Sequence, residues 1–371
     1  MNITVIGAGA WGTALAISLS AYHRVTLWSI DAAQVEAMRT ARCNQSFLPD
    51  IPLPENLDLS ADLPAALGDA ELALVAVPVA ALRPVLKEIA RLPGRPPLSN
   101  SLDETTSHST RLQTTAVKSL VIPQAGERTN EKGTVKFPGV IWVCKGFEAE
   151  TALLPHQVAA EVLPEKFCCG VLSGPSFAQE VARGLPAALT LASSDTEFAS
   201  RAAQALHHAR LRIYASNDVI GVEVGGAVKN VMAIAAGICD GLGLGHNARA
   251  ALLTRGLAEI ARLGLKLGGR PETLSGLSGA GDLILTCTGD LSRNRQVGML
   301  LVQQLDLPEI LRRLGHVAEG VYTVREVHRL AQRLGVAMPI SEAVYRVLYE
   351  QLPAVDAVEA LLNRVPNTEF Q

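Results

Sequence analysis

The sequence predicts an α/β protein in which an N-terminal Rossmann-like, doubly wound sheet is followed by an all-helical C-terminal domain. Three observations carry this prediction: short apolar runs alternate with helix-like stretches over the first 92 residues, a glycine-rich turn follows the first of these runs, and strand-like runs almost vanish after Asn217. Strands that alternate with helices typically form a parallel sheet with right-handed crossovers.

The expected strands are short apolar runs in the first half of the chain, at residues 3–6, 25–28, 72–77, 140–144, 170–172, 187–191 and 211–214. Helices are expected early at 13–20 and 32–39, and later at 219–239, 248–267, 283–287, 317–334 and 341–350. The change from mixed to helical pattern places a boundary near Ser216. A chain of 371 residues is also too long for one ordinary core, since domains hold roughly 100–200 residues. We therefore expect a dinucleotide-binding domain at 1–216 and a helical substrate-binding domain at 217–371.

One stretch of the first domain breaks this pattern. Residues 94–138 have little periodicity and few large apolar side chains. A structureless connection of this length is unusual inside a compact domain. We expect a mobile surface insertion, with an active-site lid or a partner arm as the alternative.

Composition excludes several classes of protein. The chain is 48% hydrophobic and 19% charged with a net charge of -3, which gives no electrostatic basis for binding nucleic acid but leaves a small anionic ligand possible. The six cysteines include no C-x-x-C pair, so neither a zinc site nor a disulfide framework is expected. The chain starts directly with strand residues, and its apolar run 72–82 is interrupted by Pro78 and falls short of the roughly 20 residues of a membrane span. We expect no membrane span and a cytoplasmic location.

The glycine-rich turn is the first candidate site. Gly7, Gly9 and Gly12 form the pattern G-x-G-x-x-G between a strand and a helix. In such a turn the first glycine permits the tight bend, the second lets the backbone approach a pyrophosphate, and the third lets the helix pack on the strand. An ordinary turn is the alternative, but the strand before it and the helix after it favour a site for NAD or NADP.

Asp31 is the candidate for the acidic residue that binds the adenosine ribose. Asp31 lies 19 residues after Gly12, close to the usual spacing, but slightly beyond the expected strand end at Trp28. A ribose contact and a helix cap are both open for Asp31. No Arg or Lys lies between Thr26 and Gln34 to accept a 2′-phosphate, which favours NAD.

Two lysines and an aspartate lie in apolar surroundings. Lys145 follows the strand at 140–144, at the sheet edge where doubly wound folds bind ligands, although a lysine there is often only solvated. Lys229 and Asn230 lie in an apolar helical stretch, so Lys229 either reaches the surface or has a partner. Asp282 is a plausible partner, and a helix N-cap is its alternative role.

A basic turn completes the candidate residues. Arg293 and Arg295 lie in the sequence SRNR at 292–295, and guanidinium groups bind phosphate in a bidentate manner. A solvated helix start is the alternative. Together with a nicotinamide site, these residues suggest reduction of a carbonyl on a small phosphorylated substrate.

In these and further stretches the chain resembles the bacterial-type glycerol-3-phosphate dehydrogenases, which interconvert dihydroxyacetone phosphate and sn-glycerol 3-phosphate. The matching stretches are GAGAWGTALA at 7–16, LVAVP at 74–78, CKGFE at 144–148, LSGPSFAQEV at 172–181, EVGGAVKNVMAIAAGICDGL at 223–242, LTRGLAEI at 253–260, LSGLSGAGDLILTCTGDLSRNR at 274–295, VAEGVYT at 317–323 and MPISEAVYRVL at 338–348. They occur in order and span nearly the whole chain outside 94–138.

The resemblance implies roles for individual residues. It makes Lys229 the catalytic acid/base, with Lys145 and Asp282 beside it. The implied substrate contacts are Lys145, Gly174, Ser176, Lys229, Asn230, Asp282, Ser292, Arg293 and Asn294. The implied cofactor contacts, added to Gly7, Gly9, Gly12 and Asp31, are Ala10, Trp11, Lys145, Ala178, Arg293, Val317 and Glu319. The product would feed phospholipid synthesis.

Two features depart from the family pattern. Members often carry His or Arg where this chain has Ile30, near the adenosine ribose, and the insertion at 94–138 is expected to fall outside the pattern. A β-hydroxyacid dehydrogenase of the 6-phosphogluconate type and a non-catalytic NAD(H)-sensing protein remain alternatives. The Ala- and Gly-rich helical domain could pair as a homodimer.

Overall fold

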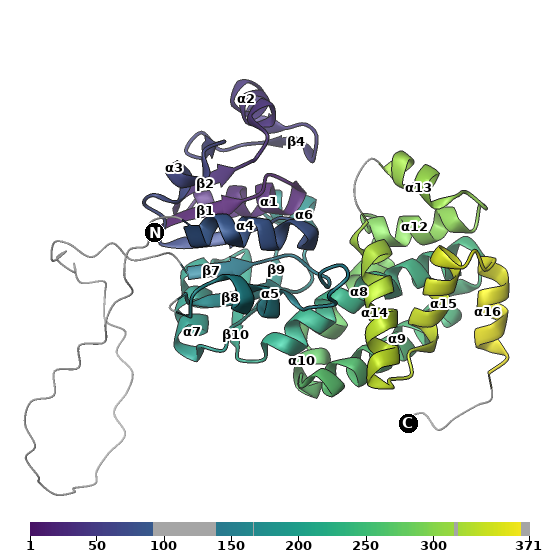
Figure 1. Ribbon diagram of the computed structural model, residues 1–371. Coiled ribbons are helices and arrows are strands. Elements are labelled where there is room, and N and C mark those ends of the chain that lie inside the picture. Colours follow the sequence, from purple (N-terminus) through teal and green to yellow (C-terminus); the bar gives the residue numbers. More distant parts are fainter. Residues whose placement is uncertain (92–138, 166, 315–317, 365–371) are drawn as a thin grey trace, which may run out of the picture.

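A computed structural model describes residues 1–91, 139–165, 167–314 and 318–364 of the chain. The predictions made for the insertion at 94–138 and for Val317 lie outside these residues. Figure 1 shows the strands gathered in the N-terminal part, in purple to teal, and the helices of the C-terminal part beside them, in green to yellow.

Within the described residues, eight strands form the main sheet, in the order β10-β9-β8-β7-β6-β1-β2-β5. Their bounds are β1 (Asn2–Ile6), β2 (Arg24–Trp28), β5 (Asp58–Ser60), β6 (Leu72–Val75), β7 (Gly139–Trp142), β8 (Cys169–Ser173), β9 (Ala187–Ala192) and β10 (Leu211–Ser216). Every neighbouring pair from β5 to β8 is parallel. The carboxyl ends of these six strands therefore share one edge, which is where open α/β sheets bind ligands.

The last two strands depart from this parallel arrangement. β9 pairs antiparallel with β8, and β10 continues parallel to β9. The connection after β8 contains only the five-residue helix α6 (Ala178–Ala182), which packs beside Trp11 and Ala14 of α1 (Ala10–Ser20). This segment does not run back to the edge of the sheet where β8 began. β9 therefore starts near the edge where β8 ended and runs in the opposite direction to β8.

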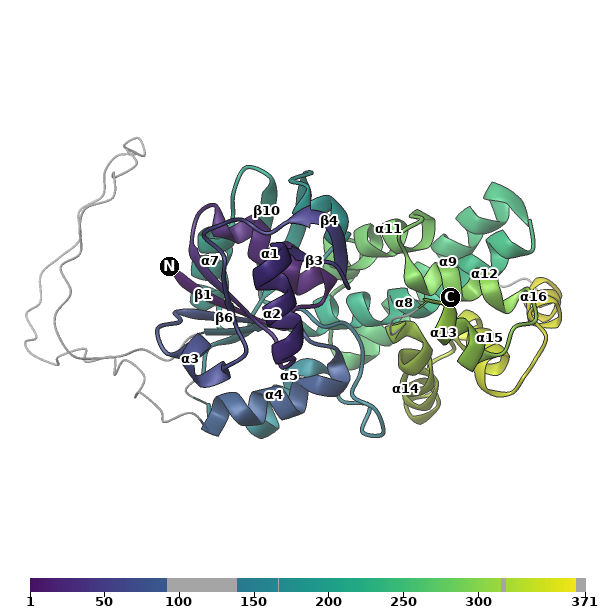
Figure 2. The same cartoon turned by 90° about the horizontal axis from the view of Figure 1, so that it is seen from above.

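Helices cover both faces of the sheet, and strand side chains alternate between them. In β1, Val5 packs with the cluster under α1, α2 (Ala32–Ala41) and α7 (Thr196–Leu206). Its neighbour Ile6 packs with the opposite cluster, under α3 (Leu63–Leu67), α4 (Val79–Arg91) and α5 (Pro155–Val162). Figure 2 shows α1 and α7 on one side of the sheet and α4 and α5 on the other, the arrangement of a doubly wound fold.

A second sheet was not predicted. It is a two-stranded antiparallel pair of β3 (Cys43–Asn44) and β4 (Leu48–Pro52). Leu48 is fully buried in a small cluster with Ala14 of α1. The pair therefore lies against the helix that follows the glycine turn.

The C-terminal part is built around one long helix. Its elements are α8 (Val219–Gly241), α9 (Gly245–Leu267), α10 (Pro271–Leu274), a π-helix η1 (Leu277–Gly281), α11 (Asp282–Thr288), α12 (Arg293–Leu301), α13 (Leu307–Leu314), α14 (Glu319–Leu334), α15 (Pro339–Tyr349) and α16 (Ala354–Leu362). α8 contacts α9, α11, α12, α14 and α15, and its apolar side chains form the centre of their shared core.

α8 is also long and apolar enough to cross a membrane by length and composition alone. However, 89% of its most apolar 18-residue window is buried within the protein. An apolar helix that is covered by other helices is the core helix of a globular domain.

Candidate active site

In the turn between β1 and α1, two of the three glycines are required by the fold, and the third leaves space open. Gly7 has a φ of +114°, and a Cβ there would lie 2.5 Å from the carbonyl oxygen of Ala76. A Cβ on Gly12 would overlap the carbonyl oxygen of Gly7, so only glycine lets α1 approach the turn. A Cβ on Gly9 would meet nothing within 4 Å. The face of the turn at Gly9 is therefore open to a ligand.

The N-terminus of α1 is suited to an anion. Gly9 is the N-cap residue, no side chain caps the helix, and its first turn contains no acidic residue. The first N–H groups of the helix, beginning at Ala10, are thus available to a phosphate and lie at the positive end of the helix dipole. Trp11, in the first turn of α1, and Ala178 are both predicted cofactor contacts, and both pack against the buried cluster that contains Ala14 and Val181. The residues present fit the pyrophosphate of NAD or NADP.

After β2, the structure gives Asp31 one of the two roles that were predicted for it. The Asp31 carboxylate accepts hydrogen bonds from the N–H groups of Ala33 and Gln34 at 2.9 and 3.2 Å, and thereby caps α2. The cap alternative is the one that the structure contains, and the ribose contact stays a prediction. Beside it, the Ile30 side chain is 86% exposed.

The two lysines meet at one carboxylate. Asp282 accepts a hydrogen bond from Lys145 Nζ on Oδ2 and one from Lys229 Nζ on Oδ1, each at 2.5 Å. The Asp282 side chain is 1% exposed and that of Lys229 8%, so both charges are largely removed from water. The partner alternative for Asp282 is the one that the structure contains.

Three elements far apart in sequence deliver this triad. Lys145 follows β7 at the carboxyl edge of the sheet, and its Nζ also donates to the Gly174 carbonyl at 3.2 Å. Lys229 projects from the middle of α8. Asp282 begins α11 directly after η1, and a π-turn of this kind changes the direction in which the following side chains point.

Burial and two neighbouring charges together lower the pKa of Lys229 from 10.5 to about 8. Desolvation is the largest effect and lowers this pKa, the negative charge of Asp282 raises it, and the positive charge of Lys145 lowers it. An amine with a pKa near 8 can both hold and release a proton near neutral pH. Burial also raises the pKa of Glu319, which the positive charges of Arg293, Lys145 and Lys229 oppose.

Polar side chains surround the triad. Thr286 Oγ1 accepts a hydrogen bond from Lys229 Nζ at 2.8 Å and donates to the Asp282 carbonyl at 2.6 Å. Asn294 donates from Nδ2 to Asn230 Oδ1 at 3.0 Å, and its own Oδ1 accepts from the Gly320 N–H at 3.0 Å. Asn230 is therefore held through its oxygen, which leaves its Nδ2 without a partner among the described residues.

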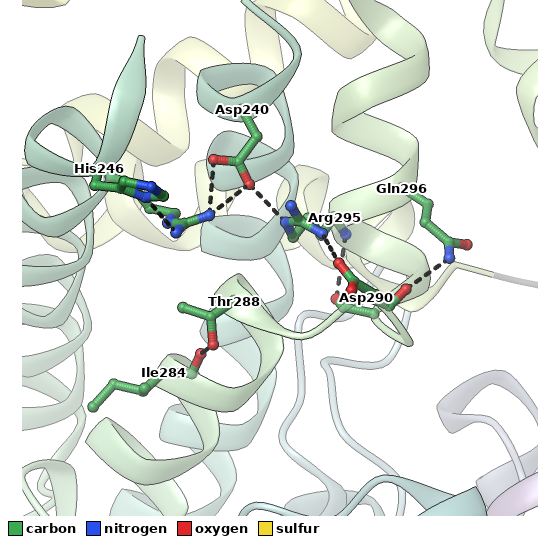
Figure 3. Close-up of polar contacts among 9 residues, drawn as sticks. Asp240, His246, Ile284, Thr288, Asp290, Arg295 and Gln296 are labelled. Carbon is green, nitrogen blue, oxygen red and sulfur yellow. Dashed lines mark hydrogen bonds and ion pairs between the residues drawn. The ribbon is translucent and has the colours of Figure 1, made fainter. Parts of the chain in front are cut away.

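The basic turn SRNR is split between two roles. Arg295 is paired at Nε with Asp240 at 2.7 Å and at Nη1 with Asp290 at 3.0 Å, as Figure 3 shows, so it is not available for phosphate. Arg293 is exposed and has no hydrogen bond or ion pair among the described residues. Ser292 caps α12 by accepting from the Arg295 N–H at 3.3 Å. Of the two guanidinium groups, only Arg293 stays a candidate.

The loop after β8 lies against the lysine triad. The Gly174 carbonyl accepts from both Lys145 Nζ and Ser176 Oγ, the latter at 3.1 Å. Gly174 has a φ of +142°, a conformation that favours glycine. Through the Gly174 carbonyl, this loop helps to hold the Lys145 ammonium beside Asp282.

Sequence reasoning missed two groups of residues in this region. Thr286 lies four residues after Asp282 on one helix, a spacing that places the two on the same face and could have revealed it. Gln34 and Asn44, which contact the glycine turn, gave no signal because the short strand β3 was not predicted.

Family models match both parts of the chain. The model described as the NAD-dependent glycerol-3-phosphate dehydrogenase C-terminus matches residues 218–359, and that of the N-terminus matches residues 2–98 and 97–199. The chain belongs to this family. The match favours the glycerol-3-phosphate hypothesis over one of the 6-phosphogluconate type.

Individual relatives agree over the full length. The chain is 54% identical to the glycerol-3-phosphate dehydrogenase (NAD(P)+) of Thiobacillus denitrificans over 370 residues, and to that of Nitrosomonas eutropha over 369, with 100% of this chain and 99–100% of each relative covered. It is similar to the crystal structure of the Coxiella burnetii glycerol-3-phosphate dehydrogenase, with 38% identity, a TM-score of 0.83, and 98% and 99% of the two chains covered.

Proposed function

We propose that this chain catalyses the NAD(P)-dependent interconversion of dihydroxyacetone phosphate and sn-glycerol 3-phosphate, with Lys229 as the acid/base. The observation that carries the proposal is the Asp282 carboxylate that joins Lys145 and Lys229 at the carboxyl edge of the sheet. The reaction would supply glycerol 3-phosphate for phospholipid synthesis in the cytoplasm.

Lys229 is suited to move the proton of the substrate hydroxyl. A bound NADH or NADPH would supply the hydride to substrate C2. The Lys229 ammonium gives a proton to the oxygen on C2 as the carbonyl becomes a hydroxyl, and the neutral amine takes it back in the oxidation. A pKa near 8 lets one group serve both directions near neutral pH.

Lys145 and Asp282 hold this proton donor in place. Asp282 fixes Lys229 Nζ through Oδ1, and Thr286 fixes it from a second direction. An ammonium has three donor hydrogens, so one remains for the substrate oxygen. Lys145 brings a second positive charge to the same carboxylate, where it stabilises negative charge that develops on the substrate oxygen.

The remaining candidate residues divide between the two ligands. Arg293, Ser292 and Asn294 are assigned to the phosphate end of the substrate, and Gly174, Ser176 and Asn230 to its carbon chain. Gly7, Gly9, Ala10, Trp11 and Gly12 are assigned to the dinucleotide, together with Asp31, Lys145, Ala178, Arg293, Val317 and Glu319. The guanidinium of Arg293 and the Nδ2 of Asn230, which have no partner within the described part of the chain, support this division.

The two parts of the chain contribute different residues to the proposed site. The part at 1–216 contributes the dinucleotide turn and Lys145, and the part at 217–371 contributes Lys229, Asp282 and the phosphate-binding residues. A homodimer formed through the helical part is included in the proposal. Its partners are otherwise small molecules, with no nucleic acid.

The decisive experiment follows NADH oxidation by absorbance with dihydroxyacetone phosphate as substrate. A parallel assay offers 6-phosphogluconate with NADP+. Turnover of the first substrate alone supports the proposal. Turnover of 6-phosphogluconate, or tight NADH binding with no turnover of either substrate, refutes it in favour of the 6-phosphogluconate-type enzyme or of an NAD(H) sensor.

A further inference from the structure

Two amide side chains, the buried one of Asn44 and the half-buried one of Gln34, contact the glycine turn. The Ala8 carbonyl accepts two hydrogen bonds, from Asn44 Nδ2 and from Gln34 Nε2, both at 2.9 Å. The two donors come from β3 and from the first turn of α2, elements that the turn itself does not include. Side chains from outside the glycine turn therefore hold its Ala8 carbonyl in place.

The network is oriented at both of its ends. Asn44 Nδ2 also donates to Thr13 Oγ1 on α1 at 2.8 Å, and the Asn44 residue is 1% exposed. The Ser29 hydroxyl, at the end of β2, donates to Gln34 Oε1 at 2.6 Å. Because the Gln34 oxygen faces Ser29, its Nε2 faces the Ala8 carbonyl.

Holding the Ala8 carbonyl fixes a donor on the opposite side of the backbone. The Ala8 carbonyl and the Gly9 N–H belong to the same planar trans peptide, so the two groups point in opposite directions. The carbonyl points at Asn44 and Gln34, and the Gly9 N–H therefore points away from them. The Gly9 side of the turn is the side on which a Cβ would meet nothing within 4 Å.

We infer that Asn44 and Gln34 are positioning residues for the dinucleotide, which hold the Ala8–Gly9 peptide with its N–H directed at the pyrophosphate before the cofactor binds. The inference rests on the proposed function for its ligand. A site that is ordered in advance loses less conformational entropy on binding. Without these two donors, part of the cofactor's binding energy would be spent on ordering the peptide.

The expected consequence is specific to the cofactor. Loss of one buried hydrogen bond of this kind weakens binding by about five- to tenfold. Asn44→Ala should raise the Kd and KM for NADH by this factor. The value of kcat at saturating NADH and the KM for dihydroxyacetone phosphate should change less than about twofold, since neither residue touches the lysine triad.

Asn56→Ala is the matched control. Asn56 Nδ2 donates to the Ser20 carbonyl at 2.7 Å, at the opposite end of α1 from the turn. The variant removes the same type of hydrogen bond, from an asparagine side chain to a backbone carbonyl, but at a place far from the turn. It should lower the melting temperature without changing the Kd for NADH.

The test measures the Kd for NADH by fluorescence titration, steady-state constants and melting temperature for wild type, Asn44→Ala, Gln34→Ala and Asn56→Ala. Gln34 is only half buried, so its variant keeps the test available if Asn44→Ala does not fold. A folded variant of Asn44 or Gln34 with an unchanged Kd overturns the inference, as does an equal rise in Asn56→Ala. Failure of the wild type to bind NADH overturns the proposed function as well, which distinguishes the two failures.

Discussion

Removal of the Lys229 amine is the most direct test of the assigned chemistry. We expect Lys229→Ala to lower kcat for reduction of dihydroxyacetone phosphate by about 10²–10⁴-fold, the usual contribution of a positioned general acid, or about 3–5 kcal/mol of the barrier. Lys145 supplies the second amine of the triad, but it contacts the opposite oxygen of Asp282 and also the Gly174 carbonyl. It is therefore held away from the position that Lys229 occupies.

The variant should remain folded and bind the cofactor. Asp282 keeps Lys145 as a partner, so no unpaired buried charge is created, and the glycine turn is on a different element. Lys229→Met, which also fills the space of the side chain, separates loss of the amine from loss of packing. Turnover is measured by NADH oxidation and binding by fluorescence titration. A kcat within threefold of wild type in either variant would refute the role of Lys229.

Three further predictions follow from the same geometry. Because Lys229 must be protonated for reduction and its pKa is about 8, kcat/KM for reduction should fall tenfold per pH unit above about pH 8. The kcat/KM for oxidation should rise up to pH 8 and then level off. In Asp282→Asn the midpoints of both pH profiles should move to lower pH, and an unmoved midpoint would contradict the assignment. Ile30→Arg should strengthen NADPH binding relative to NADH by about tenfold, because the exposed isoleucine offers no charge to a 2′-phosphate. The Kd values of both cofactors are measured by titration, and a ratio of the two that is the same in the variant as in the wild type would contradict this prediction. Gly9→Ala should keep the wild-type melting temperature but lose dinucleotide affinity. Gly12→Ala, whose Cβ would overlap a backbone oxygen, should lower the melting temperature by several degrees. Calorimetry and titration measure the two effects, and the reverse pattern would count against the roles given to the turn.

Much of the molecule follows from local sequence. The strand at Asn2–Ile6, the glycine pattern after it and the helix that begins at Ala10 are encoded by residues that are neighbours in the chain, and their geometry is decided by φ, by Cβ contacts and by helix termini. The long apolar helix Val219–Gly241 follows in the same way from its composition. The residue types of the triad also showed that buried charges needed partners.

Tertiary structure decided which partners these are. Asp282 lies 137 residues from Lys145 and 53 from Lys229, and no local rule brings the three together. Asp240 withdraws Arg295 from the phosphate-binding candidates, and the short segment after β8 reverses β9. Local propensities act over a few residues, whereas ion pairing, strand direction and the support of the glycine turn by Asn44 depend on segments that meet only when the sheet and the helical core have formed.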